Sequence, residues 1–143
     1  FGDFTRVLPI MIGVPEAQAI ALSLNGEVPV RPGTHDLTVT LMATAGLRLD
    51  EVVVTELRDG VFFAELFVES AEGMVSVSAR PSDAIALAVR SKAPIFVSAA
   101  VLEEAGIAIS RASSDGLSDD EIDEVVEEFH RMLETASPSD FAT

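Results

Sequence analysis

The chain has 143 residues, a length that suits one domain with one hydrophobic core. Hydrophobic residues make up 48% of it, too large a share for a disordered chain, and the absence of cysteine excludes disulfides and thiolate metal sites. We recognise no signal peptide and no apolar run long enough to span a membrane, so we expect a cytoplasmic protein without a membrane partner.

The net charge of −15 is unevenly distributed. Residues 1–102 contain 12 acidic and seven basic side chains, whereas residues 103–143 contain 12 acidic and only two basic ones. An acidic protein repels phosphate backbones at long range, so we expect weak non-specific binding of nucleic acid.

The first predicted elements are a strand and a helix. Apolar residues predict a strand over residues 5–12, in which Pro9 indicates an edge position or a bulge. Pro15 can occupy the first turn of a helix, which Asn25 and Gly26 then end.

A second helix is predicted after a turn-rich connection. Thr34 is the expected N-cap, and Gly46 is expected to end the helix. Its apolar face is predicted to consist of Leu37, Leu41 and Ala45.

Alternating patterns then predict three strands, over residues 52–57, 61–69 and 74–79, with a hairpin turn at Asp59 and Gly60. A third helix begins at Pro81 and closes near Arg90 or Lys92. A short buried strand over 94–97 and a short helix over 99–105 follow.

These elements predict an α+β fold with a mixed or antiparallel sheet in one domain, residues 1–109. Residues 110–117 are expected to be a linker, and residues 118–143 an acidic amphipathic helix with its tail. The likeness of residues 15–22 to residues 81–87 suggests a duplicated strand-and-helix motif, although chance similarity between alanine-rich helices explains it about as well.

Two clusters of polar residues each surround a predicted helix start. The first contains Arg31, His35 and Asp36, and the second contains Arg80, Ser82 and Asp83. Both place an arginine and a carboxylate where free backbone N–H groups suit phosphate or carboxylate ligands. The alternative is that these residues only cap their helices. Glu16, in the first turn of the first helix, is a third candidate acid.

A series of segments in this order, residues 8–13, 16–17, 31–32, 34–37, 62–64, 80–88 and 94–97, resembles the bifunctional nuclease (BFN, DUF151) domain family. The resemblance covers residues 5–106 and is most specific in the runs 35–37 and 80–83, while the tail is similar to actinobacterial members. It implies an α+β fold with a duplicated strand-and-helix motif, a homodimer, and nuclease activity on DNA and RNA.

Two departures from the family pattern bear on these expectations. Ser78 stands where many members have Asp, and if that Asp were a metal ligand, its replacement would put activity here in doubt. The first two strands of the family are expected to be missing, which would leave the strand over residues 5–12 without a partner.

Three hypotheses follow. In the leading one, the protein is a divalent-metal-assisted nuclease in which Glu16, Asp36 and Asp83 hold Mg²⁺ or Mn²⁺. His35 would then act as general base or electrostatic stabiliser together with these acids, while Arg31, Arg80 and Ser82 bind the phosphate. The second is a non-catalytic dimeric module that binds a small anionic ligand or a partner protein, and the third makes both clusters purely structural ion pairs.

Overall fold

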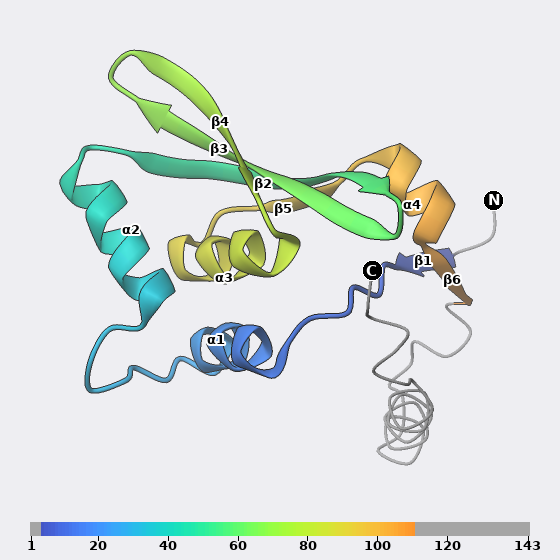
Figure 1. The fold of residues 1–143 in the computed structure, drawn as a ribbon, viewed down its shortest axis with the longest axis horizontal. Coiled ribbons are helices and arrows are strands. Elements are labelled where there is room, and N and C mark those ends of the chain that lie inside the picture. The colour runs from blue at the N-terminus through green and yellow to red at the C-terminus, as the bar shows by residue number, and fades with distance from the viewer. Residues whose placement is uncertain (1–3, 111–143) are drawn as a thin grey trace. The chain divides into compact units, whose positions relative to one another are not determined.

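The computed structural model describes residues 4–110 and has the expected α+β architecture (Figure 1). The elements, in chain order, are β1 (Phe4–Val7), α1 (Val14–Leu24), α2 (Thr34–Thr44), β2 (Arg48–Arg58), β3 (Val61–Ser70), β4 (Gly73–Ala79), α3 (Pro81–Ser91), β5 (Ile95–Val97), α4 (Ala99–Ala105) and β6 (Ile107–Ser110). The chain divides into two compact units, of which one comprises residues 7–107 and the other includes most of β1 and β6.

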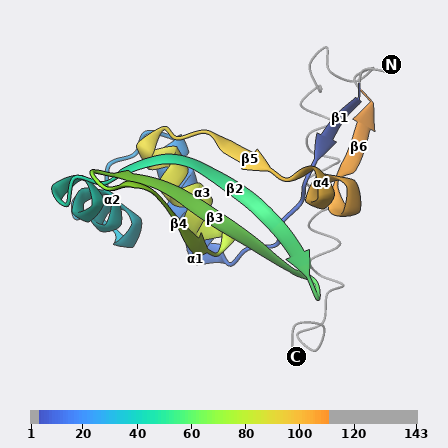
Figure 2. The ribbon, with the colours of Figure 1, turned by 90° about the horizontal axis from the view of Figure 1, so that it is seen from above.

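The larger unit is built on a mixed four-stranded sheet in the order β4-β3-β2-β5. β2, β3 and β4 are antiparallel neighbours, whereas β5 pairs with β2 in parallel. Asp59 and Gly60 join β2 to β3 with φ angles of 52° and 76°. Two positive φ angles are typical of the type I′ turn that matches the strand twist, so the predicted hairpin is confirmed. Figure 2 shows the long, twisted ribbon that results.

α3 is the central helix of this unit, because it lies between the sheet and α1 (Figure 1). Ala84, Ala86 and Ala88 are fully buried, and such small side chains let the neighbouring elements approach closely. The core that α3 shares with the sheet contains Leu49, Val52, Ala64, Leu66, Val68, Ala84, Leu87 and Ala88. The sheet covers one face of α3 and α1 covers another, which leaves the remaining side of this helix for polar residues.

α2 differs from its prediction at its start and on its packed face. The N-cap is Gly33, and Thr34 is the first helical residue. Val39 and Met42 pack against the core, whereas Leu37 and Leu41 are 50% and 59% exposed. The predicted apolar face is the wrong one, because this helix has apolar residues on two faces.

The strand predicted over residues 5–12 is wrong in its second half, because β1 ends at Val7. Pro9 lacks the N–H that a strand ladder needs, and the following residues run without regular structure to α1. The expectation that this strand lacks a partner is also wrong, because β1 pairs with β6, a strand that no pattern predicted.

The end of the described region also corrects two expectations. The described part of the chain does not bury β5, since Ile95 and Phe96 are 42% and 48% exposed. Ser110, predicted to begin the linker, is the last residue of β6. The remainder of the linker and the acidic helix predicted for residues 118–143 lie outside the described residues. No helix within residues 4–110 has the length and apolarity that crossing a membrane requires.

Candidate functional site

The first turns of three helices supply the acidic residues of the candidate site. Glu16, Asp36 and Asp83 are each the third residue of their helix, in α1, α2 and α3. A carboxylate is favoured there by the helix dipole and can bond to free N–H groups. Asp36 does so, accepting a hydrogen bond of 2.8 Å from the Gly33 N–H. The Glu16 carboxylate folds back over Gly13, where a Cβ atom would collide with it.

Arg80 joins two of these helices. Its Nε and Nη2 donate hydrogen bonds of 2.7 and 3.1 Å to the two carboxylate oxygens of Asp83. Its Nη1 reaches across to Glu16 Oε1, at 3.0 Å. The side chain is nevertheless 65% exposed, so one side of the guanidinium remains open to a ligand.

His35 brings α2 into the same cluster. Its Nε2 lies 3.0 Å from Asp83 Oδ1, and the imidazole is only 16% exposed. An ionised carboxylate can only accept, so Nε2 carries the proton and donates it, which leaves Nδ1 as the basic nitrogen. Among the residues that the structure describes, Nδ1 has no hydrogen-bond partner.

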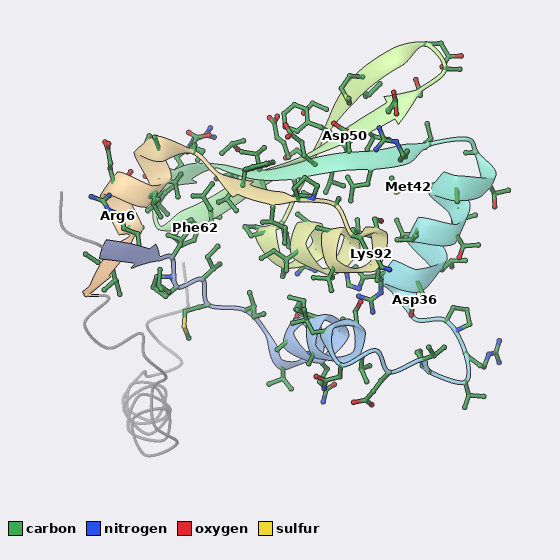
Figure 3. The ribbon with its side chains drawn as sticks, turned by 180° about the vertical axis from the view of Figure 1, so that it is seen from behind. Arg6, Asp36, Met42, Asp50, Phe62 and Lys92 are labelled. Carbon is green, nitrogen blue, oxygen red and sulfur yellow. The ribbon has the colours of Figure 1, made fainter. Side chains whose placement is uncertain are left out.

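Asp36 has a partner that the sequence analysis missed. Arg90 donates from Nε to Asp36 Oδ1 at 2.6 Å and from Nη1 to the Ala86 carbonyl at 3.0 Å. The Arg90 side chain is 11% exposed, and Figure 3 shows Asp36 at the end of α2 that faces α3. Arg90 lies seven residues after Asp83 and therefore two turns along the same side of α3. That spacing is the signal that could have identified it.

These side chains line one pocket of about 370 Å³ between the three helices. Its walls include Glu16, His35, Asp36, Arg80, Asp83 and Arg90. Arg31 lies at the same pocket, and the part of the chain that the structure describes provides no ion-pair or hydrogen-bond partner for it. The structure therefore brings six of the seven predicted site residues together. Ser82 instead lines a neighbouring pocket, which Glu16 and Arg80 also reach.

The family model described as "Bifunctional nuclease domain" matches residues 2–110, which is most of the chain. The chain belongs to the bifunctional nuclease domain family. Proteins of two strains of Mycobacterium tuberculosis, each named as uncharacterized, are 43% identical over 136 residues, covering 95% of this chain and 81% of theirs. Bifunctional nuclease 1 of Arabidopsis thaliana is 33% identical over 123 residues, covering 78% of this chain and 38% of that protein.

In this bifunctional nuclease domain, the ion pairs keep two carboxylates ionised. The hydrogen bonds from Arg80 are the main cause that lowers the pKa of Asp83, and His35 adds to the effect. The hydrogen bond from Arg90 lowers the pKa of Asp36, followed by the bond from the Gly33 N–H. The Asp83 carboxylate in turn raises the pKa of Arg80. The cluster thus holds opposite charges side by side at neutral pH.

We expect the domain to lose stability in acid partly through Asp83. Its pKa is lower in the folded than in the unfolded chain, so its contribution is complete above the ordinary value of 3.8 and is lost as the pH falls through the folded value. The free energy of unfolding of Asp83→Asn, measured in urea, should therefore fall less between about pH 6 and about pH 3 than that of the original protein. Glu103→Gln, which removes an exposed carboxylate without an ion pair among the described residues, is the control. Equal acid sensitivity of Asp83→Asn and the original protein would contradict this expectation.

The predicted metal site requires that Glu16, Asp36 and Asp83 have carboxylate oxygens free to hold Mg²⁺ or Mn²⁺. Within residues 4–110, no group of three or more His, Asp or Glu side chains is arranged to hold a metal. Arg80 occupies the place between Glu16 and Asp83, and Asp36 is turned toward Arg90. The three carboxylates therefore do not fit a shared Mg²⁺ or Mn²⁺ site in this arrangement.

Ser78, the residue that departs from the family pattern, lies away from the cluster. It is an exposed residue of β4 that pairs with Glu65, on the side of the sheet opposite to the buried Leu66. It lines neither the pocket around His35 nor the one around Ser82. A serine at this position therefore leaves the geometry of the His35 cluster intact.

Proposed function

We propose that this domain hydrolyses phosphodiester bonds of DNA and RNA in the cytoplasm, with His35 as the group that transfers the proton. The observation that supports it most is the His35–Asp83 hydrogen bond beside a pocket with two accessible guanidiniums. The family and the name of the Arabidopsis relative support the reaction class. The lack of cysteine in the chain is consistent with a reducing compartment.

In the proposed reaction, Nδ1 of His35 takes a proton from a water molecule that attacks the phosphorus atom. The oxygen of this water forms a new bond to phosphorus as the bond to the leaving oxygen breaks, and His35 then returns the proton to the leaving oxygen. Asp83 holds the imidazole in the tautomer with a basic Nδ1 and stabilises it when it is protonated. Arg31 and Arg80 stabilise the charge that develops on the phosphate oxygens.

The ion pairs of Arg80 are not purely structural. Sealed guanidiniums without an adjoining pocket would have indicated a structural role, but Arg80 is mostly exposed and lines a pocket. Arg90, by contrast, is largely buried and bonds within its own helix as well as to Asp36. Arg80, the N-cap residue of α3, thus lines the pocket, whereas Arg90 fixes α2 to α3.

The experiment that tests the proposal is a nuclease assay on purified protein, in parallel with Asp83→Asn. Each is incubated with DNA and RNA in buffers containing Mg²⁺, Mn²⁺ or EDTA. We expect cleavage by the original protein and a large loss of cleavage in Asp83→Asn. An amide at this position carries no negative charge that would orient the His35 imidazole and stabilise its protonated form. No cleavage in any buffer, or equal cleavage by both proteins, would overturn the proposal.

The same assay decides whether the Mg²⁺ or Mn²⁺ predicted from the sequence takes part. Cleavage that continues in EDTA would support a reaction carried by His35 and the arginines alone. Cleavage only with a divalent ion would mean that Arg80 leaves Glu16 and Asp83 in the active state, a movement that its exposed position permits.

A second function, binding of a small anionic ligand without cleavage, is favoured by the charge of the cluster. Three carboxylates face three guanidiniums, those of Arg31, Arg80 and Arg90, so little net positive charge remains for a polyanion. Together with the acidic chain, this favours a small anion over a long nucleic acid. Tight binding of phosphate in a protein that cleaves neither DNA nor RNA would select this function.

We further propose that the domain forms a homodimer through the outer face of α2. Leu37 and Leu41 are separated by one turn and both are at least half exposed, which is unusual for a helix surface that faces water. Light scattering after gel filtration should give the mass of a dimer, and Leu41→Glu should shift it toward the monomer. A monomeric original protein at micromolar concentrations would contradict this proposal.

A further inference from the structure

A second pocket, of about 380 Å³, adjoins the one that contains His35. Glu16 and Arg80 line both pockets, so their ion pair forms the boundary between the two. One pocket is rich in charged side chains. The other, on the opposite side of the pair, has mainly apolar walls, formed by Met11, Ile12, Val61, Phe62 and Pro81.

This apolar pocket contains one hydroxyl group without a partner. Ser82 is only 6% exposed, yet its hydroxyl has no hydrogen-bond partner among residues 4–110. The hydroxyl is not sealed, because no buried side-chain oxygen or nitrogen in this region lacks a partner. A hydroxyl that is largely buried without a hydrogen bond is uncommon, because a buried polar group normally finds a partner. It is therefore available to a ligand in the pocket.

The chemistry of this pocket fits a flat aromatic group with a polar edge. Phe62 lies on the helix side of the sheet, at the turn end of β3 (Figure 3), and offers an aromatic ring for stacking. Met11 contributes a polarisable thioether that packs well on aromatic rings. Ser82 can both donate and accept a hydrogen bond at the edge of such a ring. Both pockets have the volume of a small-ligand site.

We infer that the pocket lined by Met11, Phe62 and Ser82 binds the base of an unpaired nucleotide whose phosphate contacts Arg80. The inference rests on the proposed function and specifies its substrate as single-stranded nucleic acid. A base can enter a pocket only when it is not paired in a duplex, which selects single strands. The shared guanidinium fixes the phosphate next to the base and beside His35.

The binding test uses the full chain with isotope-labelled methionine methyl groups, observed by NMR. Nucleoside 5′-monophosphates are added in one series, and inorganic phosphate in another. A bound base should move the Met11 methyl signal through its ring current, whereas phosphate alone should not. Met42 and Met74, which line neither pocket, are internal controls whose signals should stay in place.

Matched variants test the contacts. Phe62→Leu keeps an apolar side chain but removes the ring, and should weaken nucleotide binding roughly tenfold. Phe67→Leu makes the same change on the other side of β3 and should leave binding unchanged. Ser82→Ala should weaken binding about fivefold, because it removes one hydrogen bond. A Met11 signal that does not move with nucleotides, or that moves equally with phosphate, would overturn the inference, as would equal effects of the two phenylalanine variants.

A cleavage comparison on single-stranded and double-stranded forms of one sequence separates this inference from the proposed function. Single strands should be cleaved at least about tenfold faster, since a paired base has to leave its stack first. Cleavage without preference and without a Met11 shift would overturn the base pocket while the nuclease function stands. A Met11 shift without any cleavage would support the pocket and overturn the nuclease function.

Discussion

Replacing His35 by alanine is expected to lower the rate of phosphodiester cleavage by roughly 10²–10⁴-fold, the usual contribution of a positioned acid–base group. The imidazole is placed to accept a proton from water, because its Nδ1 has no hydrogen-bond partner among the described residues. Arg31 and Arg80 would still bind the phosphate. The substitution should therefore lower kcat far more than it changes KM, which steady-state kinetics on a short oligonucleotide would measure.

His130→Ala is the matched control for this experiment, because it removes the other histidine of the chain. It should leave the cleavage rate unchanged. If His35→Ala also retained its rate, the cleavage would come from a contaminating nuclease or from a different site. Circular dichroism and thermal unfolding of both variants would show that a loss of rate does not come from a loss of the fold.

Replacing Arg90 by methionine is expected to lower the free energy of unfolding by about 2 kcal/mol, the scale of a hydrogen bond between charged groups that are largely shielded from water. Methionine retains most of the apolar stem but leaves Asp36 without its guanidinium and the Ala86 carbonyl without its second donor. The loss would be measured by urea unfolding at neutral pH. Because α2 also carries His35, the variant should cleave more slowly even where it is fully folded.

Arg48→Met provides a control at an exposed arginine, which has two ion pairs where Arg90 has one. Arg48 bonds to Asp50 and Glu69 at 2.9 and 2.6 Å, but its side chain is 64% exposed. Water screens such surface pairs, so this substitution should change stability little. Equal losses in Arg90→Met and Arg48→Met would contradict the view that the Arg90–Asp36 pair fixes α2 to α3.

Most of the secondary structure follows from local patterns that point to one answer. The Asp59-Gly60 turn, the alternation along β3 and Pro81 at the start of α3 each have a single favourable backbone conformation. β6 could not be predicted, because its existence depends on pairing with β1, about 100 residues away in the sequence. The side of α2 that packs against the core could not be predicted either, because this helix has apolar residues on both sides.

Most of the residues that the sequence suggested lie at one pocket, but their pairings could not be predicted. An arginine and a carboxylate at a helix start suggested Arg80 and Asp83, and the structure confirms that the two are in contact. That His35 bonds to Asp83 rather than to a backbone group depends on how α2 crosses α3, which no local pattern encodes. The sequence also suggested that the carboxylates could share a metal, because residue types alone do not show that Arg80 lies between two of them.

The pairing of β1 with β6 has a consequence for how such a domain can be used in larger proteins. The two strands run in opposite directions (Figure 2), so the residues at Phe4 and at Ser110 lie at the same end of the pair. A domain whose two ends lie close together can be inserted into a host polypeptide without separating the segments on either side. The Arabidopsis relative, in which the aligned part is 38% of the length, has room for such an arrangement. A circularly permuted variant, with new ends in an exposed turn such as that at Asp59 and Gly60, should fold for the same reason.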